Sequence, residues 1–223
     1  MITSALALLP ALLAVTAVHE LGHLAAAIAR RARVTRVIIG RGPRLAAFRR
    51  GGIEFGLALL PFGGRVDYVP PASSTANAVI AVGGAVANIA FGFAMLWAAA
   101  LAFGVEAMPF GMDSASPLAY ATDSTGAWLW AFPLAVVESV LYGDGAAIAA
   151  VTDALRGLWL APGAPAALHA VAALSITWAA LNMLPVPGLA TDGWQFLVWV
   201  RRAFGRAVAE AAPGETGAPT DAA

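Results

Sequence analysis

Residues 4–29 read SALALLPALLAVTAVHELGHLAAAIA, an apolar run with Glu20 as its single carboxylate and no cationic side chain. This run is longer than the ~20 helical residues that cross a hydrocarbon core. Two later runs, Ala78–Val105 and Ala166–Leu184, are also long enough to cross. We therefore expect an α-helical integral membrane protein with a core of three transmembrane helices.

The composition agrees with a membrane protein and limits its size. The 223 residues are 60% hydrophobic and only 12% charged, and the mean hydropathy of +0.77 is too high for an ordinary soluble domain. We expect one domain over residues 1–210 and a disordered tail at 211–223, which is rich in Ala, Gly, Pro and Thr. The net charge of zero gives no indication of a nucleic-acid partner, and we expect none.

The segments between the apolar runs differ in character. Val34–Ile39 and Ile53–Leu60 are short, β-prone and separated by glycines, so a small β-hairpin or re-entrant β-loop is expected between the first two helices. Gly126–Leu160 is apolar but interrupted by Pro133 and other helix-breaking or charged residues. It is either an additional membrane hairpin before the third helix or a pair of surface helices.

The distribution of arginine predicts the orientation in the membrane. All 13 cationic residues are arginine; nine lie between Arg30 and Arg65, and three more follow the last apolar run. Because cytoplasmic loops carry the excess of positive charge, we expect the Arg30–Arg65 loop and the C-terminus in the cytoplasm. The N-terminus is then outside, in a multi-pass protein of the cell (inner or plasma) membrane.

The motif His19-Glu20-Leu21-Gly22-His23 lies inside the first apolar run. On a helix, positions i and i+4 share a face, so both imidazoles can reach one Zn²⁺ while Glu20 flanks a water as general base. A chance match is a weak explanation, because the chain has only three histidines and ionisable residues are costly in a membrane. The chain has no cysteine, so the remaining ligands must be histidine or carboxylate.

A catalytic zinc needs a third protein ligand, and the residues alone leave it open. The candidates are His169 and the carboxylates, among them Asp192 in the segment NMLPVPGLATDG, residues 182–193. The prolines of this segment stop the helix, and such a break is tolerated at membrane depth where it lines a cavity. Asp192-Gly193 is by itself an ordinary turn sequence.

Taken together, the two segments resemble the site-2 protease family of intramembrane zinc metallopeptidases. That family combines His-Glu-x-x-His in one transmembrane helix with Asn-x-x-Pro-x-Pro-x-Leu-Asp-Gly in a later one. The resemblance implies that Asp192 is the third zinc ligand. It also implies that Asn182, with Pro185 of the same segment, holds the substrate backbone.

A weaker likeness covers the segment LPFGGRV, residues 60–66. It is similar to part of a membrane re-entrant β-loop in the branch that includes the bacterial envelope-stress regulator. Gly63 and Gly64 are therefore either a simple turn or an edge that pairs with an unwound substrate strand.

A second weak likeness covers GGAVAN, residues 83–88, which resembles the family's Gly-Pro-x-x-Asn motif. Gly84, Asn88 and Gly92 recur every four residues, a spacing that favours close helix packing. Asn88 is also a candidate for a hydrogen bond to a metal ligand.

The chain departs from the family pattern at three places. Ala190 and Thr191 look like an insertion before Asp192, and no PDZ-like domain is visible. Only Trp194–Val200 is apolar after Asp192, so the fourth transmembrane helix of that family branch is not expected there.

The function that we expect is a zinc metalloprotease that cleaves a transmembrane protein or peptide in or near its transmembrane segment, as in regulated intramembrane proteolysis. The alternative is a catalytically inactive scaffold that binds partner proteins, and an accessory membrane protein is left open. The complete His19, Glu20 and His23 set favours the enzyme, because a scaffold has no need of Glu20.

Overall fold

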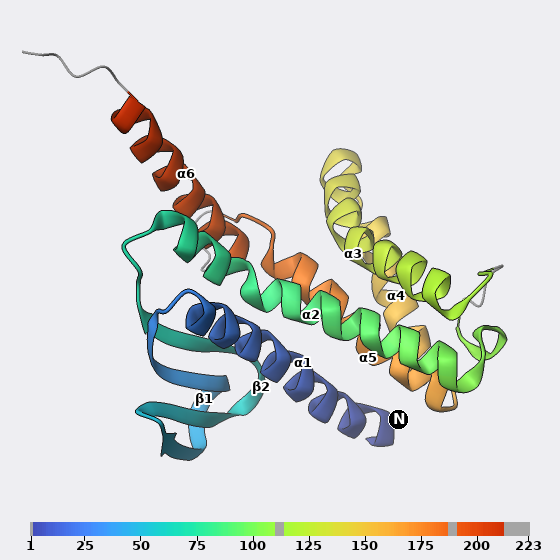
Figure 1. Cartoon of the computed structure of the whole chain (residues 1–223). Helices are drawn as coiled ribbons and strands as arrows, with labels where there is room; N and C mark the ends of the chain where they lie inside the picture. Colours follow the sequence, from blue (N-terminus) through green and yellow to red (C-terminus); the bar gives the residue numbers. More distant parts are fainter. Residues whose placement is uncertain (1, 110–113, 187–190, 212–223) are drawn as a thin grey trace, which may run out of the picture.

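The computed structural model describes residues 2–109, 114–186 and 191–211, without the side chains of 2–7, 206 and 208–211. In chain order the elements are α1 (Ile2–Ala29), β1 (Arg33–Arg50), β2 (Ile53–Val69), α2 (Ser74–Phe103), the short 3-10 helix η1 (Val105–Ala107), α3 (Pro117–Tyr142), α4 (Ala146–Leu160), α5 (Ala164–Asn182) and α6 (Asp192–Ala211). Helix α2 lies between α1 and α5 and runs antiparallel to both, the β-hairpin covers one side of α1, and α3 and α4 lie at the opposite side (Figure 1).

Among the described residues, four helices, rather than the expected three, are long and apolar enough to cross a membrane. They are Leu8–Ala29 within α1, together with α2, α3 and α5. The additional one is α3, which begins before Gly126 because Ser116 caps its first turn and Pro117 occupies the first helical position. Helix α4 has 15 residues. The interval Gly126–Leu160 is therefore part of a helical hairpin with α3 as its long arm and α4 as its short arm.

Small residues allow the three central helices to approach closely. A Cβ atom at Gly22 of α1 would lie 2.4 Å from the carbonyl oxygen of Gly83 in α2. A Cβ atom at Gly92 of α2 would lie 2.5 Å from the Ile176 side chain of α5. Near these contacts Ser175 donates a hydrogen bond to a backbone carbonyl of α2 (3.0 Å). The glycines recurring along α2 are thus the positions where its neighbours touch its backbone.

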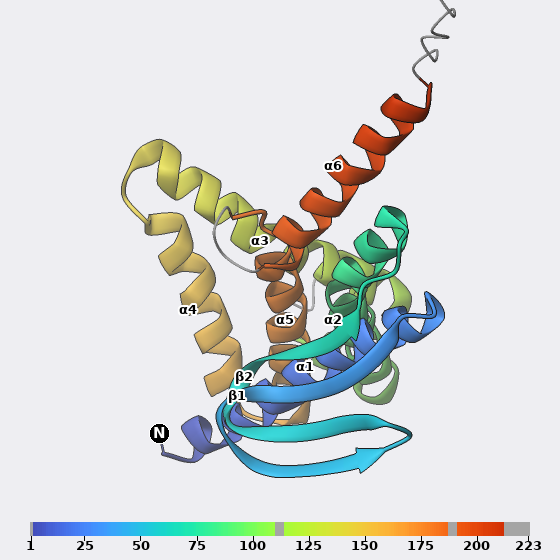
Figure 2. The same cartoon turned by 90° about the vertical axis from the view of Figure 1, so that its left-hand side faces the viewer.

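The β-hairpin is longer and more curved than the sequence predicts. Its strands have 18 and 17 residues, and Gly51-Gly52 form the turn with φ of +60° and +80°. The ribbon curls back on itself, so Arg36 is paired with both Glu54 and Asp67 (Figure 2). The first half of β1 therefore lies between the two halves of β2.

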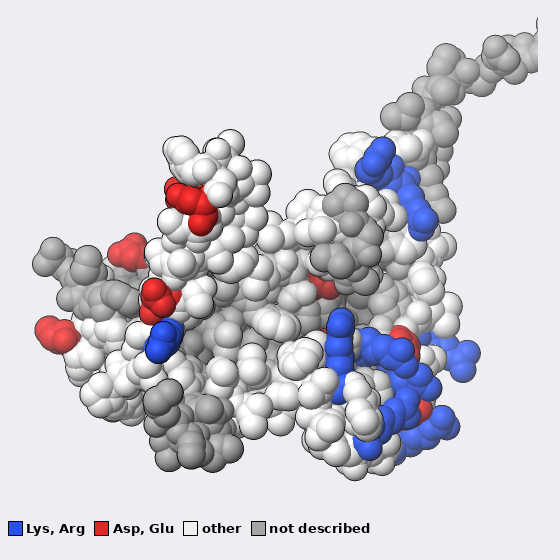
Figure 3. Space-filling view, turned by 180° about the vertical axis from the view of Figure 1, so that it is seen from behind, with Lys and Arg blue, Asp and Glu red and all other residues white. Residues whose placement is uncertain are grey.

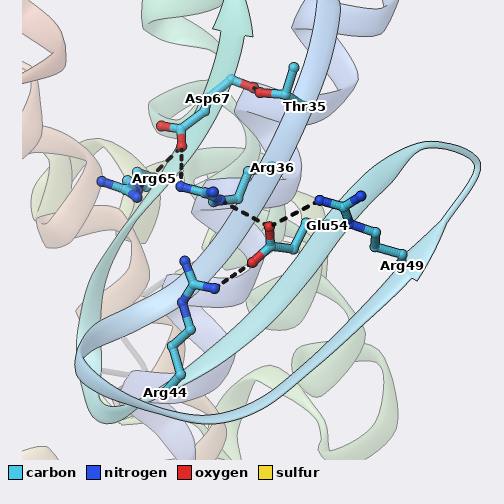
Figure 4. A network of polar contacts seen from close by, with 7 residues as sticks. All are labelled: Thr35, Arg36, Arg44, Arg49, Glu54, Arg65 and Asp67. Carbon is cyan, nitrogen blue, oxygen red and sulfur yellow. Dashed lines mark hydrogen bonds and ion pairs between the residues drawn. The ribbon is translucent and has the colours of Figure 1, made fainter.

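Ion pairs between the strands close this curl (Figure 4). The Glu54 carboxylate pairs with Arg44, with Arg36 (3.4 Å) and, more loosely, with Arg49 (3.9 Å). Arg36 also reaches Asp67 (3.4 Å), on the other half of β2. Burial of Glu54 acts to raise its pKa, but the charges and hydrogen bonds of Arg36 and Arg44 outweigh this and lower the pKa below its ordinary value.

Candidate metal centre

Three predicted ligands converge although they are distant in sequence. His19 and His23 project from the same face of α1, and Asp192 is the first residue of α6. Asp192 Oδ2 lies 3.0 Å from His19 Nε2 and 3.3 Å from His23 Nε2. The two Nε2 atoms are 3.2 Å apart.

These distances suit a metal ion held by all three side chains. Donor atoms bound at ~2.0–2.1 Å to a tetrahedral zinc lie ~3.3 Å from one another. Asp192 Oδ2 is buried and has no hydrogen-bonding partner among the described residues, although it faces both imidazoles. A buried carboxylate oxygen turned toward two ring nitrogens is what a cation at their centre would satisfy. The three side chains therefore fit zinc.

Hydrogen bonds from α2 orient the two imidazoles. His23 Nδ1 lies 2.8 Å from the Ile80 carbonyl oxygen, so Nδ1 carries the proton and Nε2 keeps a lone pair. His19 Nδ1 lies 3.4 Å from the amide of Asn88, which is buried and whose oxygen has no partner in the described structure. With this amide turned by 180°, its oxygen accepts the Nδ1 proton of His19.

Gly84 gives the imidazoles the space they occupy beside α2. A Cβ atom at this position would lie 2.5 Å from His23 Nε2 and 2.8 Å from His19 Nε2. The sequence pattern suggested helix packing at Gly84, and the structure places the imidazoles against it as well.

The metal-ligand cluster opens into a cavity of about 430 Å³ between α1, α2, α5, α6 and the hairpin. Glu20, Gly63, Gly64 and Asn182 all line this cavity. A Cβ atom at Gly64 would lie 2.7 Å from the Glu20 carboxylate, so only glycine lets β2 pass this close to it. Pro185 is exposed and does not line the cavity.

The cavity wall also contains residues to which the sequence assigned no role in the site. They are Arg41, Phe62, Arg65, Val66, Tyr68, Ile80, Ala81, Trp178 and Gln195. Burial raises the pKa of Tyr68, which therefore stays a neutral hydrogen-bond donor. Gln195 could have been identified, because it lies three residues after Asp192 and shares its helix face. Arg41 carries no such signal among nine arginines of the same segment.

His169 lies away from the candidate metal centre, where α5 packs against α3. It is buried in α5, where Trp128 donates a hydrogen bond to its Nε2 (2.9 Å) and the Tyr120 hydroxyl meets its Nδ1. It is not part of the group formed by His19, His23 and Asp192. Both ring nitrogens of His169 are thus engaged in helix packing.

The segment before Asp192 is only partly described. Ala190 lies outside the described residues. Thr191 accepts a hydrogen bond from the backbone N–H of Trp194 (3.3 Å) and donates one to the Leu184 carbonyl (2.8 Å). Thr191 therefore caps α6 and fixes the helix start at which Asp192 stands.

Comparison with known proteins gives two curated relatives. A candidate zinc metalloprotease of Synechocystis sp. is 32% identical over 111 residues, which are 43% of this chain and 30% of the relative. A chloroplastic candidate membrane metalloprotease of Arabidopsis thaliana is 42% identical over 57 residues, 26% of this chain and 13% of the relative. The matched segments thus span less than a third of either relative.

A family model described as peptidase family M50 matches residues 7–212, which include every candidate site residue. The four long apolar helices in the described part of this chain agree with a membrane protein. On this match the chain belongs to peptidase family M50, the site-2 protease family.

Proposed function

We propose that this protein is a zinc metalloprotease that hydrolyses peptide bonds in or near the transmembrane segments of membrane-anchored substrates. The observation that carries the proposal is the convergence of three metal-binding atoms from α1 and α6 beside Glu20, in one cavity. A purely structural metal site would be closed by four protein ligands, whereas three ligands leave a position for water or substrate.

Each residue has a distinct part in this chemistry. Zinc bound by His19, His23 and Asp192 would polarise the scissile carbonyl and acidify a water molecule. Glu20 takes a proton from the attacking water and returns it to the leaving amine. Its place beside the ligands, at the cavity wall, supports this role.

Two parts of the cavity wall are suited to hold an extended peptide. The β2 edge at Gly63 and Gly64 offers backbone groups to a substrate strand. Asn182 lines the same cavity, with its amide nitrogen donating to the Trp178 carbonyl oxygen (3.0 Å). A transmembrane helix hides its peptide bonds, so a protease must unwind the segment that it cuts. Strand pairing along β2 supplies hydrogen bonds for the unwound backbone.

The arginine distribution supports an orientation with the hairpin and α6 on the cytoplasmic side of the cell membrane. Arginines gather over the hairpin and the adjoining part of α6, whereas the acids lie mostly toward α3 and α4 (Figure 3). With the N-terminus outside, His19 and His23 fall in the cytoplasmic half of α1. The α3–α4 hairpin returns the chain to the side from which it left, which keeps α5 parallel to α1.

The test uses the full chain in detergent and a fluorogenic peptide with a transmembrane segment. We expect zinc in the purified protein and cleavage that stops on chelation and returns with zinc. Glu20→Gln should keep the zinc and lower turnover by ~10²–10⁴-fold. Bound zinc without any cleavage by the unmutated chain would favour the inactive scaffold instead. Near-normal turnover in Glu20→Gln would refute the role of the glutamate.

A further inference from the structure

Arg41 reaches the cavity by crossing the neighbouring strand. It stands in β1 opposite Leu60, and its side chain passes over Gly63 of β2. A Cβ atom at Gly63 would lie 2.7 Å from Arg41 Nε, and Gly63 has φ +65°, which disfavours other residues. The next residue, Gly64, stands in the same way against the Glu20 carboxylate. Because Gly63 and Gly64 have no side chains, the Arg41 guanidinium and the Glu20 carboxylate can both reach the same cavity.

The charge of Arg41 is not neutralised by the network that pairs four other hairpin arginines with Glu54 and Asp67. Arg36, Arg44 and Arg49 pair with Glu54, and Arg65 pairs with Asp67 (3.5 Å). Within the described part of the chain, Arg41 has no ion pair within 4.0 Å, and it lines the same cavity as Glu20. Its guanidinium therefore keeps its donors available for a ligand in the cavity.

We propose that Arg41 donates a hydrogen bond to the scissile carbonyl oxygen and stabilises the negative charge that develops there. This rests on the proposed function. As the water oxygen bonds to the carbonyl carbon, the C=O electron pair moves onto oxygen beside the guanidinium. The carbonyl then re-forms, the C–N bond breaks, and Glu20 delivers the proton to the amine. A guanidinium suits this position because it stays charged and carries several donors in a fixed plane.

The size of the effect follows from comparable donors in other enzymes. Removing one donor to a developing oxyanion costs ~10²–10³-fold in kcat. Because the charge appears only as the bond is attacked, the loss should fall on kcat and leave KM nearly unchanged. A cation that instead recognised an acidic substrate side chain would change KM, and only for peptides that carry that side chain.

The experiment compares Arg41→Gln and Arg41→Lys with Arg50→Gln, an exposed arginine at the hairpin turn that does not line the cavity. Zinc content is measured first and should be equal in all of them. For Arg41→Gln we expect kcat to fall ~10²-fold or more with KM within about twofold, whereas Arg41→Lys recovers part of the loss and Arg50→Gln matches the unmutated chain. A loss confined to KM for acidic peptides, or an unchanged kcat, would overturn the proposal.

A binding measurement separates this proposal from the proposed function. A peptide phosphinate carries a tetrahedral anion in place of the scissile bond, and a peptide hydroxamate of the same sequence binds metal without it. Arg41→Gln should weaken binding of the phosphinate by ~10²-fold and leave the affinity for the hydroxamate unchanged, even if the unmutated chain cleaves nothing. Equal phosphinate affinities in the two proteins would refute a role for Arg41 in holding the anion.

Discussion

Replacing Gly84 by alanine tests the geometry of the candidate metal centre without removing any ligand. The added Cβ would lie 2.5 Å from His23 Nε2 and 2.7 Å from His19 Cε1, where ordinary contacts begin near 3.4 Å. Either α2 or the imidazoles must therefore move by ~0.9 Å. A metal site tolerates ligand displacements of only ~0.2 Å, so the substitution should weaken zinc binding.

The expected loss can be bounded from the cost of overpacking. Inserting a methyl group into a tightly packed site costs ~1–3 kcal/mol. If this strain is relieved when the imidazoles turn away, it appears as a ~5- to ~150-fold loss of zinc affinity, since 1.4 kcal/mol is a factor of ten.

Gly92→Ala is a matched control on the same helix. Its Cβ would also meet a neighbour at 2.5 Å, but that neighbour is the Ile176 side chain, away from the ligands. Zinc affinity is measured by competition with a chelator, and stability by thermal unfolding in detergent. We expect both variants to be less stable and only Gly84→Ala to lose zinc affinity. Equal affinities in the two variants would refute the close approach of α2 to the imidazoles.

Three further predictions concern other parts of the chain. Asp192→Ala should strip zinc and abolish cleavage, whereas His169→Ala should lower thermal stability and keep the metal; the reverse pattern in metal analysis would show that the third ligand is misassigned. Glu54→Gln should speed trypsin cleavage of the hairpin at pH 8. Because the pKa of Glu54 is lower in the folded hairpin, its ionised carboxylate stabilises the hairpin at pH values above the ordinary pKa of ~4.3, and this stabilisation is lost as pH falls through the lowered pKa. In the unmutated chain, hydrogen exchange of the hairpin amides should therefore rise only in acid. Reporters fused after Arg50 and Arg206 should both be cytoplasmic, and opposite sides would contradict the topology.

The sequence predicted the parts of the site that depend on local geometry. His19 and His23 were identifiable because a four-residue spacing on a helix places both on one face. Asp192 could not be chosen over His169 from spacing alone, since the pairing depends on how α6 begins beside α1. The resemblance to a known family selected Asp192, and the structure brings it to both imidazoles.

The features that the sequence did not predict depend on distant contacts. Helix α3 begins before Gly126 although Asp123 interrupts its apolar pattern, because the Ser116 cap and burial of Tyr120 extend it. In the curled hairpin, Glu54 of β2 pairs with Arg36 and Arg44, which are far apart along β1. No local pattern encodes such pairings.

Zinc K-edge X-ray absorption of the purified full chain tests the candidate metal centre most directly. The ligand set His19, His23 and Asp192 predicts two imidazole nitrogens together with oxygen donors, all at ~2.0–2.2 Å from one zinc per chain. In Asp192→Asn the imidazole signal of any zinc that remains should persist while the total zinc falls. A third imidazole in the unmutated chain would bring in His169 and contradict this ligand set, and so would a zinc surrounded by oxygen alone.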